Sequence, residues 1–237
     1  MFTKDHSPAG KKVVCEDICE ALKKIPCFNS LECDELKDLA KYFHVRRYEK
    51  EDEIFKEFNH GNQAYFVLKG SVSICIFLEG KRHVLNVLFE GDFLGIEFLF
   101  KNLPPKERFS AVSRMDGTEL LSIQRNDFRE ILKRYPMVLM NLMEYLCDVR
   151  TRDVLQQKCS RHAKGEKRLI ETIKFLQENG DKALLLGQLK HDDFAELIFS
   201  SREFVTRTSD LLFGDEFFLK NEKKKIIGVG KKISNIA

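Results

Sequence analysis

The spacing of apolar residues changes twice along this chain, and that change limits the folds it can adopt. From residue 16 to 43 the spacing is helical. From residue 45 to about 122, short apolar runs alternate with turn residues, and after residue 126 the helical spacing returns. Because helices repeat every 3.6 residues and strands every two, this order predicts helices, then a β domain, then helices again.

The β segment contains short apolar runs about ten residues apart. Three turns separate them, each containing glycine, which supplies the positive φ of tight turns. These turns are Glu79-Gly80, Glu90-Gly91-Asp92 and Asp116-Gly117. Many short strands at this spacing predict a barrel or a double-sheet jelly roll.

The N-terminal residues 1–15 lack the apolar core of a secretory signal, and we interpret them as a flexible leader. No run of about 18 consecutive apolar residues occurs, so no membrane span is predicted. The chain has seven cysteines, an odd number. Without a signal sequence, this number predicts reduced thiols in a cytoplasmic protein.

Residues 136–159 are predicted to form one long helix with apolar residues on two sides. One stripe consists of Met140, Met143, Cys147 and Val154, and a second of Leu139, Leu142, Leu146 and Val149. Such a helix must bury both sides. One side would pack on the β domain, and the other predicts a partner helix and therefore a homodimer. The alternative is a helix buried within its own domain.

Two short helical patterns meet at a tight junction between residues 194 and 212. Ser200, followed three residues later by Glu203, predicts a capping box and a helix that begins near Ser201. The outward residues of this second helix include Arg202, Glu203, Thr206 and Arg207. Two arginines in the first turns are typical of a helix that reads the DNA major groove. The alternative is an αα-hairpin with a solvated charged face.

The C-terminal tail has two apolar runs around a basic segment at residues 221–225. This pattern predicts a β-hairpin whose tip, with Lys223 and Lys224, touches phosphates, although a solvated turn would have the same residues. The charge distribution agrees with a nucleic-acid partner. From residue 159 onward there are 15 Lys and Arg against 12 Asp and Glu, while the preceding residues hold 25 of each.

The order of β-roll, long helix, helix pair and hairpin resembles the cyclic-AMP-receptor-protein/Fnr superfamily of bacterial transcription regulators. Three segments carry the resemblance: AYFVLKGSVSI with Gly70 at its turn, FEGDFLG, and FAELIFSSREFVTR. The resemblance implies an α+β fold with a jelly-roll or cupin-like N-terminal sensor domain and a C-terminal winged helix-turn-helix. The implied parts are a β-roll sensor with flanking helices (16–135), a dimerisation helix (136–159) and a DNA-binding domain (160–237).

The same resemblance implies how the chain meets DNA. Arg202, Glu203 and Arg207 would contact base edges, since Arg bonds guanine O6 and N7 and Glu accepts from cytosine N4. Three further residues would hold phosphates: Ser201, Thr206 and Lys190. The implied partners are double-stranded DNA with a palindromic operator, read as two half-sites about one helical turn apart, and RNA polymerase.

The effector position departs from the cyclic-AMP-binding members of the family. Those members carry Glu after a glycine and Arg before Ser or Thr, where this chain has Ile96 and Phe109. Glu97 and Arg108 are each one residue away, and a one-residue slip on a strand turns a side chain to the other face. We therefore expect a small-molecule effector other than cyclic AMP, with a cyclic nucleotide as the alternative. Candidate effector residues are Phe93, Ile96, Glu97, Arg108, Phe109 and Ser110.

Those phenylalanines, together with Phe66 and the long helix, would form an apolar pocket or simply a core. Iron–sulfur binding is a further alternative in this family, but the N-terminal cysteines lack the tight C-x2-C spacing. They are Cys15, Cys19, Cys27 and Cys33. The six histidines are scattered without ligand spacing, so we predict no metal site, no catalytic residues and no enzyme on the β-roll. Thiol-based redox sensing with a degenerate DNA-binding part stays open.

Three residues of the helix pair also depart from the family. Phe199 occupies a turn position that is often glycine, and a bulky residue at positive φ costs about 1 kcal/mol or more. Thr208 and Ser209 stand where aliphatic residues are usual. We therefore predict a helix pair that needs an effector-driven shift along the long helix before it presents Arg202 and Arg207.

Overall fold

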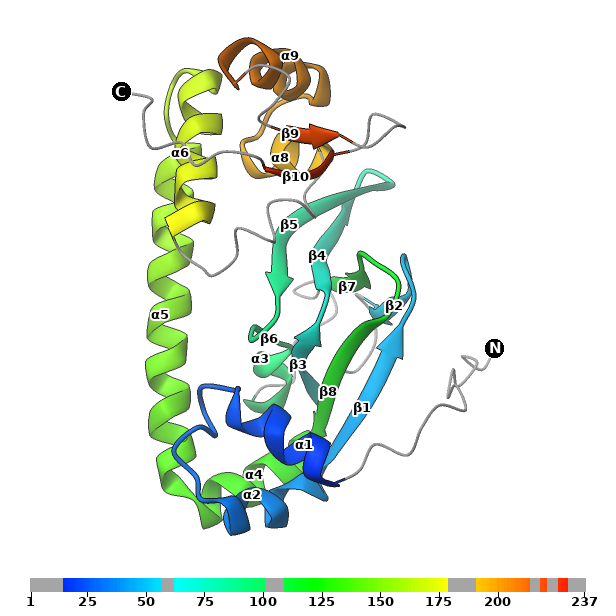
Figure 1. Ribbon diagram of the computed structural model, residues 1–237, viewed down its shortest axis with the longest axis vertical. Helices are drawn as coiled ribbons and strands as arrows, with labels where there is room; N and C mark the ends of the chain where they lie inside the picture. Colours follow the sequence, from blue (N-terminus) through cyan, green and yellow to red (C-terminus); the bar gives the residue numbers. More distant parts are fainter. Residues whose placement is uncertain are drawn as a thin grey trace. The chain divides into compact units, whose positions relative to one another are not determined.

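The computed structural model describes residues 15–56, 62–100, 109–178, 191–213, 218–220 and 226–229. The chain divides into two compact units, Met1–Leu146 and Cys147–Ala237, and the division falls inside helix α5 (Pro136–Ser160). Each unit is described by itself below (Figure 1). The predicted domain boundaries at residues 135 and 159 stay predictions. In the described parts of the chain, no helix is long and apolar enough to cross a membrane.

The first unit is an antiparallel β-roll of two four-stranded sheets. One sheet has the order β1-β8-β3-β6 and the other β2-β7-β4-β5. Their strands are β1 (Phe43–Tyr48), β2 (Glu53–Phe55), β3 (Gln63–Lys69), β4 (Ser71–Leu78), β5 (Lys81–Phe89), β6 (Phe93–Leu94), β7 (Ser110–Ser113) and β8 (Thr118–Gln124). The prediction of many short strands between residues 45 and 122 is confirmed.

Glycine-containing turns connect the strands where the sequence predicted them. Glu79 and Gly80 both have positive φ, 52° and 76°, and close the β4–β5 hairpin. Two residues with positive φ match the right-handed twist of the strands that they join. Gly70, between β3 and β4, has a φ of 91°, and a Cβ atom there would lie 2.7 Å from Thr118 Oγ1. Both space and conformation therefore require glycine at position 70.

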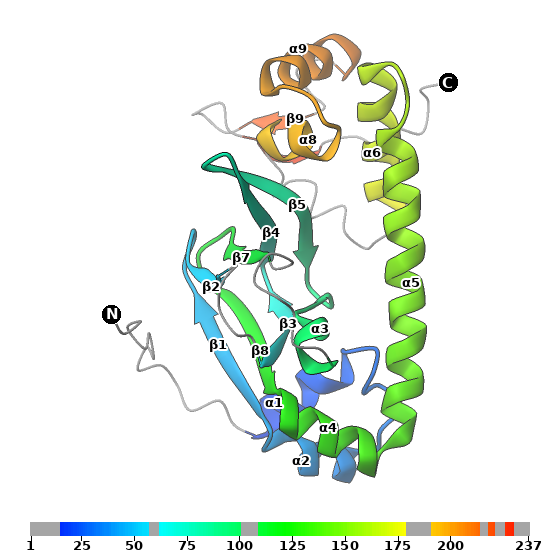
Figure 2. The same cartoon turned by 180° about the vertical axis from the view of Figure 1, so that it is seen from behind.

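Helices cover one end of the roll, as Figures 1 and 2 show. These are α1 (Cys15–Lys23), α2 (Cys33–Ala40) and α4 (Arg125–Arg134), while α3 (Ile96–Phe100) lies beside β3. Their apolar faces meet the first sheet and the start of α5 in one core that contains Leu22, Leu36, Phe66, Phe128 and Leu142. A second core fills the roll around Phe55, Val72 and Phe98. Of the predicted leader, residues 1–14 lie outside the described residues, and Cys15 is the first residue of α1.

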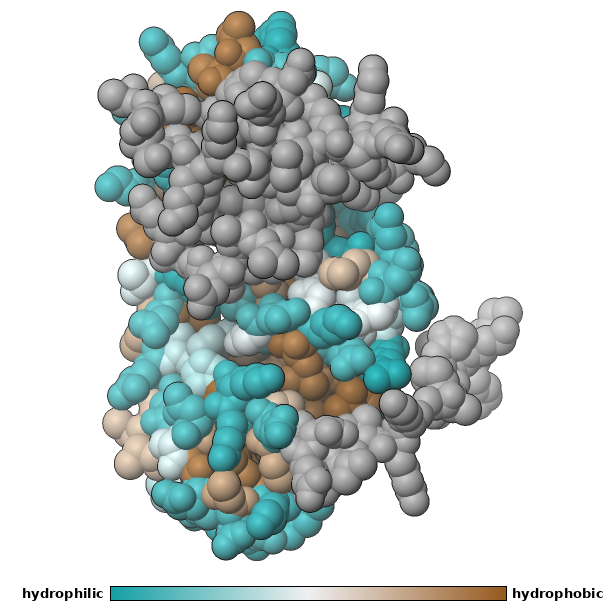
Figure 3. All heavy atoms as spheres, viewed as in Figure 1, coloured by the Kyte–Doolittle hydropathy of each residue, from teal (hydrophilic) through white to brown (hydrophobic). Residues whose placement is uncertain are grey.

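Helix α5 matches the predicted long helix at 136–159 to within one residue. It begins at Pro136, a favoured first position because a helix leaves the first N–H groups unbonded. Val138 and Leu142 are buried, whereas other apolar side chains of α5 are exposed: Met137, Leu139, Met140, Met143, Val154 and Leu155. Figure 3 shows apolar residues at the surface on the side where Figure 1 places α5.

The second unit contains α6 (Gly165–Glu178), α8 (His191–Leu197), α9 (Arg202–Phe213) and the antiparallel pair β9 (Phe218–Lys220) and β10 (Ile226–Val229). Leu169, Ile173, Phe194, Ile198 and Val205 are fully buried and form its apolar centre. The predicted helix pair and the two strands of the predicted hairpin are present.

A close approach joins α6 to α9 within this unit. Gly165 is the first residue of α6, and a Cβ atom on it would lie 2.5 Å from Cζ of Phe204 on α9. Real Cβ contacts are almost never this short. Only the missing side chain therefore lets the ring of Phe204 rest against the start of α6.

Candidate functional site

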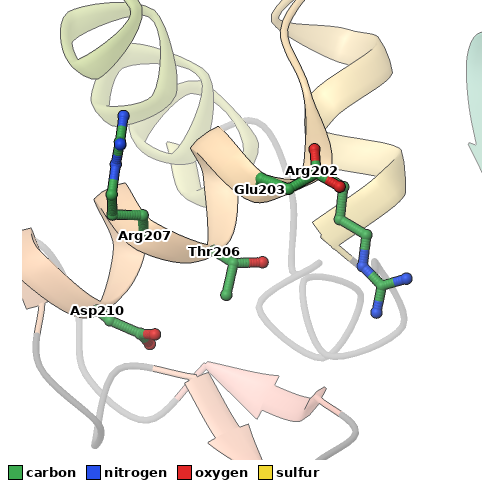
Figure 4. Close-up of a pocket in the computed structure, with 5 residues that line it drawn as sticks. All are labelled: Arg202, Glu203, Thr206, Arg207 and Asp210. Atoms are coloured by element: carbon green, nitrogen blue, oxygen red, sulfur yellow. The ribbon is translucent and has the colours of Figure 1, made fainter.

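Helix α9 presents one charged face and buries the other. Arg202, Glu203, Arg207 and Asp210 are exposed, Thr206 is half-buried, and these five residues line an open pocket (Figure 4). On the opposite face Val205, Thr208 and Ser209 are buried. Arg202, Glu203, Thr206 and Arg207 were predicted site residues, and they lie together on one side of α9. Asp210 lies with them and was not predicted.

The start of α9 differs by one residue from the predicted capping box. The N-terminal cap is Ser201, whose Oγ accepts a hydrogen bond of 3.1 Å from the backbone N–H of Phe204. The prediction that Ser200 caps the helix is wrong, because Ser200 still belongs to the turn and its N–H bonds the carbonyl of Ala195 at 2.8 Å. Since a cap typically contributes about 1 kcal/mol, Ser201 has a structural role of its own.

Glu203 carries a carboxylate that the start of α9 keeps charged. Its own backbone N–H and the Ser201 hydroxyl bond this carboxylate, and nearby Arg202 adds attraction, so the pKa of Glu203 lies below its usual value. A carboxylate held this way accepts hydrogen bonds and donates none.

Arg202 and Arg207 extend from α9 in different directions (Figure 4). Arg202 Nε lies 3.6 Å from Asp192 Oδ1 on α8, with both side chains more than half exposed. An exposed pair of this kind contributes little to stability. Its effect is directional, because it holds the Arg202 guanidinium on the α8 side of the pocket.

The turn between α8 and α9 is strained as predicted. Phe199 has a φ of 52° and its side chain is 80% exposed. A non-glycine residue in this region costs on the order of 1 kcal/mol or more, and so exposed a ring regains little of it by packing. Thr208 and Ser209 are both buried, and Ser209 Oγ donates to the carbonyl of Val205 at 2.6 Å.

Arg168 on α6 ties the helix pair to the turn that precedes α6. Its Nε donates to the carbonyl of Ile198 at 2.9 Å, and its Nη1 donates to the carbonyls of His162 and Ala163 at 3.0 and 3.3 Å. Helix C-termini leave carbonyls unbonded, and a cation there is favourable. Arg168 was not predicted from the sequence, because its carbonyl partners are set by the packing of α6 against α8.

Three predicted basic contacts lie outside the described residues: Lys190, Lys223 and Lys224. The strands that flank the predicted basic tip do pair, with Ile226 opposite Lys220 and Val229 opposite Phe218. The backbone of the predicted hairpin is therefore present on both sides of residues 221–225.

In the first unit the predicted effector residues fall into two groups. Phe93 is buried and stacks on Phe66, with ring centroids 3.9 Å apart, and the partly buried Ile96 packs against the same core. Phe109 instead packs on Phe55 and Phe98, with centroids 5.8 and 6.0 Å away. The structure does not bring Phe93 and Phe109 into one cluster. Arg108 lies outside the described residues.

The polar side chains of Glu97 and Tyr145 lie near Phe93 and Ile96. Glu97 on α3 is half-buried, and burial raises its pKa above the usual carboxyl value. Tyr145 on α5 accepts a hydrogen bond of 2.9 Å from the backbone N–H of Phe93. The hydroxyl of Ser110, which is fully buried on β7, donates to the carbonyl of Cys75 at 3.2 Å.

Six cysteines with described side chains form no disulfide, namely Cys19, Cys27, Cys33, Cys75, Cys147 and Cys159. Burial raises the pKa of Cys27, which makes it a poor nucleophile. Cys33 is exposed, and the Lys23 ammonium donates to its sulfur at 3.1 Å. No group of three or more His, Cys, Asp or Glu within the described ranges could hold a metal ion.

Comparison with known proteins supports the family resemblance. A family model described as "Cyclic nucleotide-binding domain" matches residues 45–135. The Cyclic AMP receptor protein of Thermus thermophilus is 28% identical over 187 residues, which are 78% of this chain and 84% of that protein. These matches support the resemblance to the cyclic-AMP-receptor-protein/Fnr superfamily of transcription regulators.

A second member of the superfamily, the cAMP-activated global transcriptional regulator CRP of Salmonella typhimurium, is 24% identical over 204 residues. These are 83% of this chain and 95% of that protein. Among solved structures, the c-di-GMP-responsive regulator CLP of Xanthomonas campestris gives a TM-score of 0.64 at 18% identity, covering 84% of this chain and all of that one. A CooA mutant of Carboxydothermus hydrogenoformans gives 0.60 at 17% identity, with 79% and 84% covered. At these identities the structures support the fold alone.

Proposed function

We propose that this chain is a homodimeric, sequence-specific DNA-binding transcription regulator, controlled by an effector that the β-roll senses. The observation that carries the proposal is the face of α9, where Arg202, Glu203 and Arg207 are exposed together on a helix anchored by α8. In this proposal α6, α8, α9, β9 and β10 form a winged helix-turn-helix, and α9 enters the major groove.

The chemistry of this face suits base recognition. An arginine bonds guanine O6 and N7 with two parallel hydrogen bonds, and a carboxylate accepts from cytosine N4. The lowered pKa of Glu203 favours the acceptor form that cytosine requires. Lys223 and Lys224 at the wing would add phosphate contacts, which supply affinity without sequence preference.

The exposed stripe on α5 supports a dimer. Met140, Cys147 and Val154 are exposed and seven residues apart, the spacing of a coiled-coil seam. The occupant we propose is α5 of a second copy, because a palindromic operator needs two reading helices related by a two-fold axis. RNA polymerase, which the family resemblance implies, would be the further partner at a promoter.

The effector we propose is a small molecule other than cyclic AMP, since Ile96 stands in the position where cyclic-AMP-binding members carry Glu. A cyclic nucleotide is the second candidate, favoured by the family match over residues 45–135 and by the half-buried carboxyl of Glu97. A carboxylate would accept a hydrogen bond from a ribose hydroxyl.

Selection from a random DNA library tests the DNA-binding proposal. The full-length protein, with and without a small-molecule extract of its expression host, should enrich a palindrome. Arg202→Ala and Arg207→Ala should each weaken binding to it by about 5- to 150-fold in roughly 0.1 M salt, equivalent to about 1–3 kcal/mol per bidentate contact. Arg161→Ala, at an exposed arginine before α6, is the control. Unchanged affinity and base preference in both α9 variants would refute this readout.

A further inference from the structure

Thr206 is held in an unusual direction for a helical threonine. Such residues commonly bond the carbonyl one turn earlier in their own helix, as Ser209 does with Val205 at 2.6 Å. The Thr206 Oγ1 instead lies 3.1 Å from Nδ1 of His191, the first residue of α8. A contact between two helices therefore fixes the side-chain rotamer of Thr206.

This contact decides which group Thr206 offers to a ligand. Figure 4 shows its oxygen turned toward the side where Arg202 and α8 lie, and its methyl carbon turned away from that oxygen. Thr206 is half-buried and lines the open pocket. With the hydroxyl engaged by His191, the group left for the pocket is the methyl, flanked on the same face by Arg202 and Arg207.

The surroundings argue against a phosphate at this point. A phosphate contact would require the Thr206 hydroxyl as donor, and in the His191 tautomer whose Nδ1 accepts, the single hydroxyl proton already points to that nitrogen. Asp210, one turn further along α9, brings an exposed carboxyl to the same pocket. Its charge repels a phosphate, and together with Glu203 it offsets the two arginines that line the pocket.

We propose that Thr206 reads a thymine by contact with its C5-methyl group, and that His191 is the positioning residue for this contact. Thymine is the base that presents a methyl group in the major groove, and a threonine methyl is an established partner for it. The inference rests on the proposed DNA-binding function and revises the phosphate role predicted for Thr206. It adds a thymine to the guanine and cytosine contacts of the two arginines and Glu203.

Replacement of thymine by uracil tests this inference, because uracil differs only by the missing methyl. Each thymine of the palindrome selected above is replaced in turn, and binding is measured by fluorescence anisotropy. One thymine per half-site should be sensitive, with a loss of about four-fold, the value expected for burial of one methyl group. The other thymines serve as internal controls on the same duplex.

Variants identify the residue responsible. Thr206→Ser keeps the hydroxyl but lacks the methyl, so it should bind the thymine and uracil duplexes equally. Thr206→Val keeps a methyl and should retain the preference. His191→Ala should reduce the preference without abolishing binding, and His191→Asn, which offers a polar atom near the position of Nδ1, should restore it.

The possible outcomes separate the two proposals. A selection that enriches no sequence overturns the DNA-binding function and this inference together. An enriched palindrome at which wild-type protein tolerates uracil everywhere overturns the inference alone, even if no variant folds. The same holds if Thr206→Ser retains the thymine preference, or if Thr206→Val weakens binding to every sequence, the pattern of a lost phosphate contact.

Discussion

The hydroxyl of Tyr145 on α5 accepts a hydrogen bond of 2.9 Å from the backbone N–H of Phe93. Phe93 begins the short segment that continues to Ile96 and Glu97, the candidate effector residues of β6 and α3. The long helix and this segment are therefore joined by a specific bond as well as by apolar packing. A displacement of the segment by a ligand would act on α5 directly through this bond.

We expect Tyr145→Phe to lower the free energy of unfolding by about 1–3 kcal/mol, because the Phe93 N–H loses its acceptor while the ring stays in place. Chemical denaturation of the purified protein measures this loss. Tyr135→Phe removes a hydroxyl from another tyrosine packed on the same core and is the matched control. Equal stability of the Tyr145 variant and wild type would show that the bond contributes nothing.

Glu97 predicts a pH-dependent stability. Burial raises the pKa of Glu97 in the folded state, so its favourable contribution is complete below the ordinary carboxyl pKa and is lost as the pH rises through the raised value. We therefore expect Glu97→Gln to be more stable than wild type at neutral pH, with a difference that vanishes in acid. Urea denaturation between about pH 4 and pH 8 measures it. A stability difference between the two proteins that grows as the pH falls would contradict a raised pKa of Glu97.

The same variant separates the two effector candidates. If cyclic AMP raises the melting temperature of wild type but not of Glu97→Gln, the Glu97 carboxyl binds the nucleotide. The effector is then a cyclic nucleotide, the second candidate. No shift with cyclic AMP in either protein supports a different effector. Glu144→Gln, at an exposed position of α5, reports the effect of losing a carboxyl elsewhere.

Much of the first unit could be predicted because its signals are local. The Glu79-Gly80 turn, for example, needs only the two residues that adopt positive φ. The helix α5 was predictable at both ends because its apolar spacing begins after one proline and continues without interruption. The positive φ of Phe199 was expected from the family resemblance, because Phe199 occupies a turn position that is often glycine.

Other features could not be predicted from the sequence. They depend on contacts between residues far apart in the chain, or on which of two adjacent, similar residues takes a structural role. Ser200 and Ser201 are chemically alike, and only the path of the turn decides that Ser201 caps α9. The bond between His191 and Thr206 spans fifteen residues, and that between Phe93 and Tyr145 spans fifty-two. No periodicity reports such pairs, because each depends on how two elements pack.

Phe199→Gly should stabilise the protein. Glycine adopts the observed φ of 52° without the steric cost that phenylalanine bears, and the ring is too exposed to lose much packing. After the entropy that glycine adds to the unfolded chain, we expect a gain of about 0.5–1 kcal/mol. Phe199→Ala removes the ring but keeps a Cβ atom, so it should not stabilise. Chemical denaturation compares the three proteins. An equal gain in stability in both variants would show that removal of the ring, and not relief of the backbone strain at position 199, is the cause.

Cys147 tests the proposed dimer. It is exposed at the centre of the stripe with Met140 and Val154, so the two thiols of a parallel pair of α5 helices would face each other. Mild oxidation or a short bis-maleimide should give a covalent dimer on a denaturing gel. Cys147→Ser should abolish it, whereas Cys33→Ser, at an exposed thiol on α2, should not. A monomeric mass by light scattering at micromolar concentration would contradict the dimer.

The absent side chain of Gly165 has a consequence for evolution in this chain. Because the ring of Phe204 rests directly on the start of α6, the direction in which α6 leaves the preceding turn also fixes the direction of α9. One added methyl group at position 165 would force the Phe204 ring, and with it the start of α9, to shift while leaving Arg202 and Arg207 chemically intact. In the proposed dimer, such a change would alter the separation of the proposed half-sites but not the bases read within each. Under the proposed function, operator spacing and operator sequence would therefore depend on different residues and could change independently.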